Sequence, residues 1–339
     1  MHRKATPCAP GAVPVVTPNG PCRIRGSEHL TVDGAELFLL TRGADCRAPV
    51  LLWLHGGPGG AQRPLFQYYQ GDLEDHFVVA YWDQRGAGRS YDPEADPRLL
   101  TITRHIADLD AIVDHLRGRF NHDTVILAGH SWGGALGLLY AREFPGKVSH
   151  VAAIAPLIAP AASQFAAFAF VSDEATARGE AHILAKLREL GTPPFENSDE
   201  VLALERLTNR YGGVFHQPPR RFAVLIEAIA RGLVTPWEVP RLIRSNEITL
   251  AAMHDELRGL DLAQSVPSVD VPVLFLLGRH DRHVDSRIAA RYLEVLDAPS
   301  KRIIWFERSA HNVPFEESAR FREIVIQELV PASDSRFAD

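Results

Sequence analysis

Apolar runs rich in β-branched residues recur along the chain and alternate with stretches of helical composition. Residues 27–32 and 35–41 flank Asp33-Gly34, a pair typical of a tight turn, and together predict an opening β-hairpin. Further strands are predicted at 50–54, 77–81, 124–128, 148–155, 271–277 and 302–306. Between them, residues 102–120 carry apolar side chains on one stripe and predict an amphipathic helix. This alternation indicates the α/β class, with a mostly parallel sheet and helices on both faces.

Residues 157–264 interrupt this pattern, because they have helical composition and little strand character. We interpret them as a helical cap inserted into a core formed by residues 27–156 and 265–330, after an irregular segment at 1–26. The insertion leaves the sheet at the carboxyl end of predicted strand 148–155, and the candidate site residues also follow the carboxyl ends of strands. We therefore expect the insertion to cover the functional site. Its first segment, 157–171, is mostly apolar, and it either faces a pocket or packs the cap onto the core. The last residues, 331–339, are expected to fray.

Composition narrows the possible functions. The chain has 339 residues, 46% of them hydrophobic, and a formal net charge of −6, and it has no lysine- or arginine-rich block, so a nucleic-acid partner is not expected. No apolar run is long enough to span a membrane, and the prolines that follow Met1 argue against a secretion signal. The chain has an odd number of cysteines, Cys8, Cys22 and Cys46, which indicates free thiols in a reducing cytoplasm. Nothing in the sequence fixes the oligomeric state.

The segment Gly129-His130-Ser131-Trp132-Gly133 lies between a predicted strand and a predicted helix. G-x-S-x-G in this context is typical of a nucleophile elbow, a sharp turn that exposes a serine hydroxyl. The helix N-terminus beside it favours negative charge. Ser131 is therefore the candidate nucleophile, and the N–H of Trp132 is a candidate donor to an oxyanion.

Two further blocks follow earlier strands. His55-Gly56-Gly57-Pro58-Gly59 comes after strand 50–54, where a glycine-rich loop can supply a second oxyanion donor, which we assign to Gly57. Asp83-Gln84-Arg85-Gly86-Ala87-Gly88-Arg89-Ser90 comes after strand 77–81. We interpret Asp83 and Arg85 as a structural ion pair rather than as catalytic groups.

A serine nucleophile needs a base and an acid that orients the base. Asp281 follows strand 271–277 and His311 follows strand 302–306, which gives the chain order serine, acid, histidine. Asp285 is the alternative acid, four residues farther on. His280 and His283 beside Asp281 could suggest a metal site, but two histidines in a surface loop are more often solvated, so we expect neither a metal nor another cofactor.

Taken together, His55-Gly56-Gly57-Pro58-Gly59, the block 83–90 and Gly129-His130-Ser131-Trp132-Gly133-Gly134 resemble the proline iminopeptidase family of α/β-hydrolases. The resemblance covers roughly residues 30–156 and 265–330. It implies the α/β-hydrolase fold and a cofactor-free serine hydrolase with the triad Ser131, Asp281 and His311. Peptidases of this family release an N-terminal proline and bind its amino group through acidic cap residues.

The sequence departs from that family where the substrate is chosen. The peptidases carry a charged leucine-arginine-glycine segment after the strand that follows the elbow, whereas residues 154–158 here are uncharged. Four cap glutamates are candidate amine-binding residues: Glu205, Glu227, Glu238 and Glu247. The predicted function is cleavage of a small ester or amide, including short peptides, through an acyl-enzyme. The alternatives are an esterase or lactonase for apolar substrates and, more distantly, a non-catalytic ligand receptor. The apolar start of the cap predicts that short acyl esters react at least as readily as prolyl amides.

Overall fold

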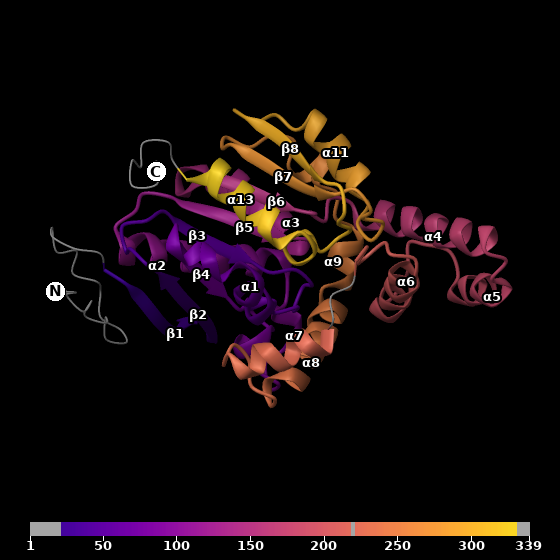
Figure 1. Cartoon of the computed structure of the whole chain (residues 1–339), viewed down its shortest axis with the longest axis horizontal. Helices are drawn as coiled ribbons and strands as arrows, with labels where there is room; N and C mark the ends of the chain where they lie inside the picture. The colour runs from indigo at the N-terminus through magenta and orange to yellow at the C-terminus, as the bar shows by residue number, and fades with distance from the viewer. Residues whose placement is uncertain (1–21, 218–220, 331–339) are drawn as a thin grey trace.

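The computed structural model describes residues 22–217 and 221–330, in which an eight-stranded sheet has the order β1-β2-β4-β3-β5-β6-β7-β8 (Figure 1). Its strands are β1 (Ile24–Val32), β2 (Ala35–Gly43), β3 (Val50–Leu54), β4 (Val78–Trp82), β5 (Val125–His130), β6 (Val148–Ile154), β7 (Val273–Gly278) and β8 (Lys301–Phe306). β2 pairs antiparallel with β1 and β4, and every other pair of neighbours is parallel. The predicted mostly parallel sheet and its opening hairpin are confirmed. Cys8 and the tail 331–339 lie outside the described residues.

Strand bounds differ from the predictions by a few residues for local reasons. β3 has the predicted bounds, whereas β6 ends at Ile154 because Ala155 has a φ of 42° and leaves the extended conformation. β7 begins at Val273, two residues later than predicted. Pro272 precedes it, and a proline has no N–H to donate to a ladder.

Helices flank the sheet and also fill the connection between β6 and β7. The flanking helices are α1 (Arg63–Gln70), α2 (Ile102–Phe120), α3 (Trp132–Glu143), α11 (Ser286–Val295), α12 (Val313–Glu316) and α13 (Ser318–Leu329). The connecting helices are α4 (Pro160–Ala177), α5 (Ala181–Leu190), α6 (Ser198–Arg210), α7 (Arg221–Ala230), α8 (Glu238–Ala252), α9 (His254–Arg258) and α10 (Leu262–Ser265). Short 3₁₀ turns lie at Gly71–Asp75, Gly88–Ser90, Pro97–Leu99 and Pro145–Lys147.

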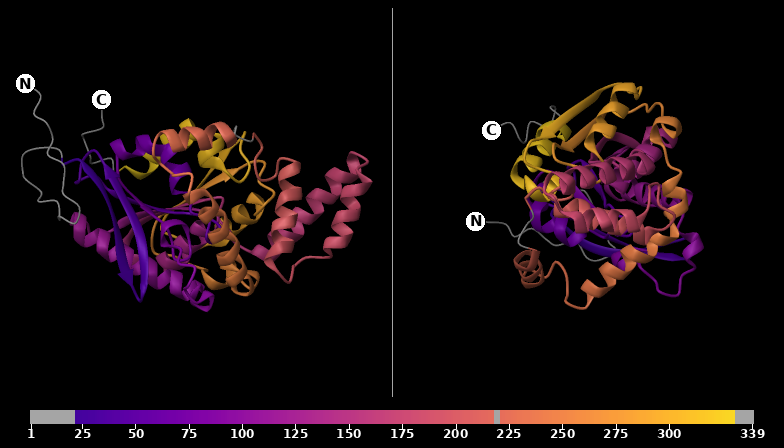
Figure 2. Two further views of the ribbon diagram at one scale, coloured as in Figure 1. Left: turned by 90° about the horizontal axis from the view of Figure 1, so that it is seen from below. Right: turned by 90° about the vertical axis from the view of Figure 1, so that its right-hand side faces the viewer.

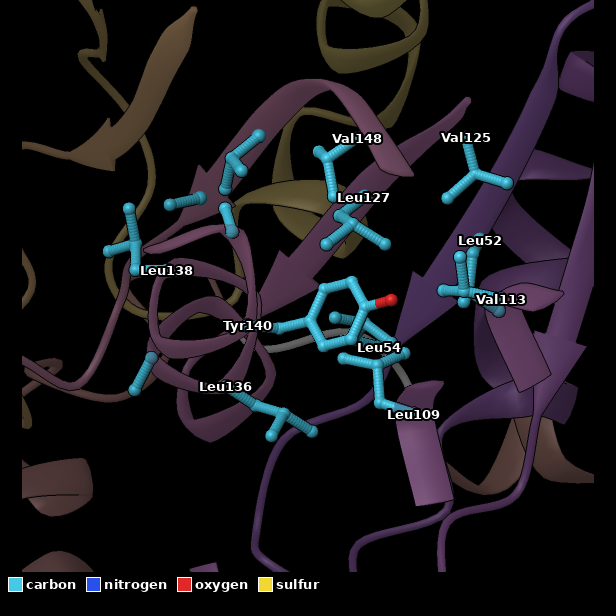
Figure 3. Close-up of a cluster of buried hydrophobic side chains, with 14 of the residues drawn as sticks. Leu52, Leu54, Leu109, Val113, Val125, Leu127, Leu136, Leu138, Tyr140 and Val148 are labelled. Atoms are coloured by element: carbon cyan, nitrogen blue, oxygen red, sulfur yellow. The ribbon is translucent and has the colours of Figure 1, made fainter. Parts of the chain in front are cut away.

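The central strands bury both of their faces. In β3, Leu52 and Leu54 belong to the apolar cluster that α2, α3 and α11 complete, part of which Figure 3 shows around Tyr140. Leu51 and Trp53 belong to a second cluster, completed by α1 and α13. Side chains alternate across a strand, so a continuous apolar run such as 50–54 requires helices on both faces of the sheet.

The insertion between β6 and β7 consists of helices and connecting loops, as far as its residues are described. Its first part, α4 to α6, has a small apolar core of its own that includes Val171, Leu187 and Leu204. This part projects beyond the end of the sheet (Figures 1 and 2), whereas α8 lies lower, against the loop after β4. The insertion therefore meets the core beside the loops that follow β3, β4 and β5.

Candidate active site

Ser131 occupies the turn between β5 and α3. Its φ of 55° and ψ of −117° are unusual for a residue with a side chain, and such backbone geometry costs free energy that the surrounding structure must supply. The Ser131 N–H donates to the carbonyl of Ile154 at 2.9 Å, and the Ser131 carbonyl accepts from the N–H of Leu157 at 3.1 Å. These bonds to the end of β6 and the start of the insertion hold the turn in place.

Glycines around Ser131 make the turn possible by letting backbone segments approach closely. A Cβ on Gly129 would lie 2.2 Å from the carbonyl oxygen of Gly133. A Cβ on Gly133 would lie 2.1 Å from the carbonyl oxygen of Leu54, at the end of β3. Both separations are far below van der Waals contact, so each position requires glycine.

Asp281 and His311 are brought together by the loops after β7 and β8. His311 Nδ1 lies 3.0 Å from Asp281 Oδ2, and the Asp281 side chain is fully buried. Asp281 Oδ1 accepts from the backbone N–H groups of His283 and Val284 at 2.9 and 3.2 Å. Asp285, the alternative acid, instead caps α11 and pairs with Arg287, so it does not orient His311.

The backbone around His311 is fixed from three directions. The His311 N–H donates to the carbonyl of Val214 in the insertion at 3.1 Å. The His311 carbonyl lies 2.9 Å from His130 Nε2, which must donate because a carbonyl can only accept. Burial, aided by the nearby His311, lowers the pKa of His130 to about 3, so His130 stays neutral near pH 7. Glu316 receives the N–H of Ala310 through Oε1 and the N–H of His216 through Oε2.

Gln84, which no motif in the sequence singled out, connects the two loops proposed to hold an oxyanion. Gln84 Oε1 accepts from the indole N–H of Trp132 at 3.0 Å, and Gln84 Nε2 donates to the carbonyl of His55 at 2.8 Å. The Gln84 N–H donates to His55 Nε2 at 3.0 Å, and burial lowers the pKa of His55 to about 4. Among described residues, the backbone N–H groups of Gly57 and Trp132 have no protein acceptor. The sequence feature that could have indicated a role for Gln84 is its position inside the block 83–90.

The predicted ion pair between Asp83 and Arg85 is wrong. Arg85 instead pairs with Asp108 of α2, with Nε 2.7 Å from Oδ2 and Nη2 2.7 Å from Oδ1. Asp83 pairs with Arg63 of α1 at 3.3 Å and accepts the N–H of Arg89. Each side chain points to a different helix, so the two charges stabilise separate contacts of the same loop.

Two cavities meet at Ser131. One, of about 100 Å³, lies under α4, α6 and α9. The other, of about 590 Å³, lies between the loop after β3 and helices α7 and α8. Both cavities are bordered by Gly57, Ser131, Glu205, Leu250 and His283. Ser131 therefore sits at their junction.

Of the four candidate cap glutamates, Glu205 alone borders these cavities. Glu227 accepts from the hydroxyl of Tyr68 at 2.5 Å and pairs with Arg231, and Glu238 pairs with Arg89 at 2.5 Å. Glu247 is exposed on α8. Within the described residues, no hydrogen bond or ion pair reaches the Glu205 carboxylate. The structure thus separates Glu205 from the other three.

His280 and His283 point to different surroundings. The His280 ring stacks on His216 with centroids 3.6 Å apart, whereas the His283 ring packs edge-on to His311 with centroids 4.8 Å apart. Across residues 22–217 and 221–330, no three potential ligands form a metal-binding group. His283 thus belongs to the site as a neighbour of His311, a position that its sequence spacing did not reveal.

Comparison with known proteins identifies the family. Residues 49–187 match the family model described as the alpha/beta hydrolase fold. The chain is 31% identical over 298 residues to the probable aminopeptidase YbaC of Bacillus subtilis, covering 87% of this chain and 93% of that protein. The chain belongs to the proline iminopeptidase-like family of α/β-hydrolases. A proline iminopeptidase of Saccharolobus solfataricus is 24% identical and covers 81% of this hydrolase and 83% of its own length.

Solved structures agree on the fold. The proline iminopeptidase of Mycobacterium smegmatis matches with a TM-score of 0.64 at 20% identity, over 89% of this chain and 96% of its own. The enol-lactonase of Burkholderia xenovorans matches with a TM-score of 0.60 at 17% identity, over 88% and 98%. The predicted α/β-hydrolase fold is therefore confirmed. In the described part of this hydrolase, no helix combines the length and apolarity needed to cross a membrane.

Proposed function

We propose that this hydrolase is an aminopeptidase-type enzyme that cleaves small amides and esters carrying a free amino group next to the scissile carbonyl. Ser131 attacks that carbonyl, and His311, oriented by Asp281, accepts the serine proton. The N–H groups of Gly57 and Trp132 stabilise the oxyanion. His311 then protonates the leaving group, and water hydrolyses the acyl-enzyme. Residues 157–264 act as the cap over this core, and the protein works in the cytoplasm without a cofactor.

The observation that carries the proposal is the position of Glu205. Glu205 borders both cavities together with Ser131, and no described residue forms a hydrogen bond or ion pair with its carboxylate. Glu205 is partly buried, and a charge that is partly withdrawn from water is stabilised by a partner of opposite sign, so this carboxylate is suited to a substrate ammonium group. Burial lowers the pKa of the neighbouring His283, which is therefore mostly neutral near pH 7 and does not supply that charge itself. The negative charge remains available to the substrate.

An esterase or lactonase for apolar substrates is the second candidate. It is favoured by the aliphatic side chains that line the larger cavity, including Leu225, Val234 and Leu242. The uncharged segment 154–158 points in the same direction, and it motivated the prediction that acyl esters react at least as readily as prolyl amides. The two candidates differ in one requirement, because only the aminopeptidase needs an amino group on its substrate.

The experiment compares prolyl- and alanyl-p-nitroanilide with propionyl-p-nitroanilide, which lacks the amino group. We expect kcat/KM to be about 100-fold higher for the amino compounds, because losing one partner of a close charge pair costs several kcal/mol. Glu205→Gln should remove this preference. Glu247→Gln, the same change on an exposed cap helix, should retain it.

Equal rates for the amino and propionyl compounds in the wild-type enzyme would instead support the esterase. Labelling with a fluorophosphonate probe tests the nucleophile separately, since Ser131 should carry the adduct and Ser131→Ala should not react. A labelled residue elsewhere would refute the proposed mechanism.

A further inference from the structure

The two cavities at Ser131 differ in size and in their access to the general base. Only the larger cavity is bordered by His311, together with His130 and Asn312. The smaller cavity is bordered instead by residues of α4, α6 and α9, such as Ala167, Leu204 and Leu257. A substrate that reacts with Ser131 must place its acyl part on one side of the serine and its leaving group on the other.

The chemistry decides which part lies where. When the tetrahedral intermediate breaks down, the bond between the carbonyl carbon and the leaving nitrogen or oxygen is cleaved. The proton that His311 took from Ser131 moves to that leaving atom. The leaving group must therefore lie beside His311, which places it in the larger cavity. The acyl part then occupies the smaller cavity, where Glu205 at the junction can reach an amino group on the carbon next to the carbonyl.

The volumes of the two cavities limit the size of the substrate part that each cavity can hold. An apolar cavity of about 150 Å³ holds a benzene molecule, so the smaller cavity, at about 100 Å³, suits a side chain smaller than a phenyl ring. The larger cavity, at about 590 Å³, falls within the range of pockets that enclose whole small-molecule ligands. Its wall on the insertion is mostly aliphatic and includes Leu225, Ala228, Val239 and Leu242.

We propose that the enzyme selects substrates whose acyl part is a small amino acid and whose leaving group is bulky and apolar. This inference rests on the proposed function for the amino group, but the division between the two cavities rests on His311 and the two volumes. The substrate class is a dipeptide-like compound with a small first residue and a large apolar second residue.

The test measures kcat/KM for Ala-Gly-amide, Ala-Leu-amide, Ala-Phe-amide and the reversed Leu-Ala-amide and Phe-Ala-amide. We expect Ala-Leu-amide to exceed Ala-Gly-amide by roughly tenfold or more, because a leucine side chain leaves water for an apolar wall. We expect the reversed amides to be poor substrates. Equal rates for Ala-Gly-amide and Ala-Leu-amide, or faster cleavage of the reversed amides, would overturn the inference.

Two alanines on the insertion provide matched variants. Ala228 of α7 borders the larger cavity and Ala167 of α4 borders the smaller one, and both are buried. Ala228→Phe should bring the ratio of Ala-Leu-amide to Ala-Gly-amide toward one. Ala167→Phe should lower both rates in parallel and leave that ratio near its wild-type value. The opposite pattern would overturn the inference, and the wild-type series decides it if a variant does not fold.

Ester substrates separate this inference from the proposed function. If no amino compound is preferred, the proposed function fails, but the cavities can still be tested with acetate esters of bulky alcohols against methyl esters of bulky acids. We expect the acetate esters of bulky alcohols to react faster. Faster hydrolysis of the methyl esters would place the leaving group in the smaller cavity and overturn the inference on its own.

Discussion

Replacing Ser131, the proposed nucleophile, with glycine should make this protein more stable than replacing it with alanine. Ser131 has a φ of 55° and a ψ of −117°, a conformation that costs a residue with a Cβ about 1–3 kcal/mol. Alanine retains the Cβ and therefore the strain, whereas glycine adopts this conformation without it. Both variants lack the hydroxyl, so the comparison isolates the backbone.

The expected size follows from two opposing effects. Glycine removes the strain but gains conformational freedom in the unfolded chain, which costs about 0.4–1 kcal/mol relative to alanine. The balance favours Ser131→Gly by roughly 0.5–2 kcal/mol. With an unfolding entropy of about 2.1 cal/mol/K per residue, this free energy corresponds to a rise in Tm of about 1–3 °C for 339 residues.

The assay is equilibrium unfolding in urea at 25 °C, followed by circular dichroism. Ala185→Gly serves as the control, because Ala185 lies inside α5, where glycine costs about 1 kcal/mol. The same exchange of alanine for glycine should thus have opposite signs at the two positions. If Ser131→Gly is no more stable than Ser131→Ala, the elbow does not store the strain inferred from its dihedral angles.

Two further predictions concern Asp281, the proposed acid, and Glu238 in the insertion between β6 and β7. Asp281→Asn should lower kcat by about four orders of magnitude, because the His311 imidazole would adopt the wrong tautomer. Asp285→Asn should mainly destabilise α11, which Asp285 caps. An inactive Asp285→Asn variant together with an active Asp281→Asn variant would reverse the assignment. Burial raises the pKa of Glu238, but the hydrogen bonds and charge of Arg89 and the N–H of Thr235 outweigh it and lower that pKa to about 2. Because the folded-state pKa is lowered, Glu238 should stabilise the fold above about pH 4.5 and lose this effect as the pH falls toward about 2. Urea midpoints should therefore show a deficit for Glu238→Gln at pH 7 that shrinks below pH 4.5, and an unchanging deficit would contradict this.

Much of the core could be predicted because its signals are local. Residues 50–54 form β3 and residues 102–120 form α2 with the predicted bounds, since each carries the apolar period of its own element. The order of Ser131, Asp281 and His311 along the chain also follows from single strands and the turns after them. A single strand or helix, and the turn that follows a strand, depend on a few residues that are close in sequence and on the end of the sheet at which the strand stops.

Partners across the fold could not be predicted in this way. The partner of Arg85 is Asp108, because α2 packs beside the loop after β4, and no local pattern in the loop indicates that helix. Glu205 and Glu227 both lie on amphipathic helices of the insertion and look alike in sequence. The path of the insertion through space places Glu205 beside the cavities that Ser131 also borders, and it places Glu227 beside Tyr68.

The close approach of Gly129 and Gly133 means that these two glycines of the motif are required by the fold, whatever residue occupies position 131. A Cβ at Gly129 would collide with the carbonyl of Gly133, and a Cβ at Gly133 would collide with the carbonyl of Leu54. The two glycines therefore allow β3, β5 and α3 to pack closely together. Of these three positions in the motif, only Ser131 is proposed to take part in the reaction itself. A descendant of this protein that exchanged Ser131 for another residue and lost hydrolysis would still need both glycines to fold. The spacing of the two glycines thus indicates the fold, whereas the proposed hydrolysis depends on the serine at residue 131.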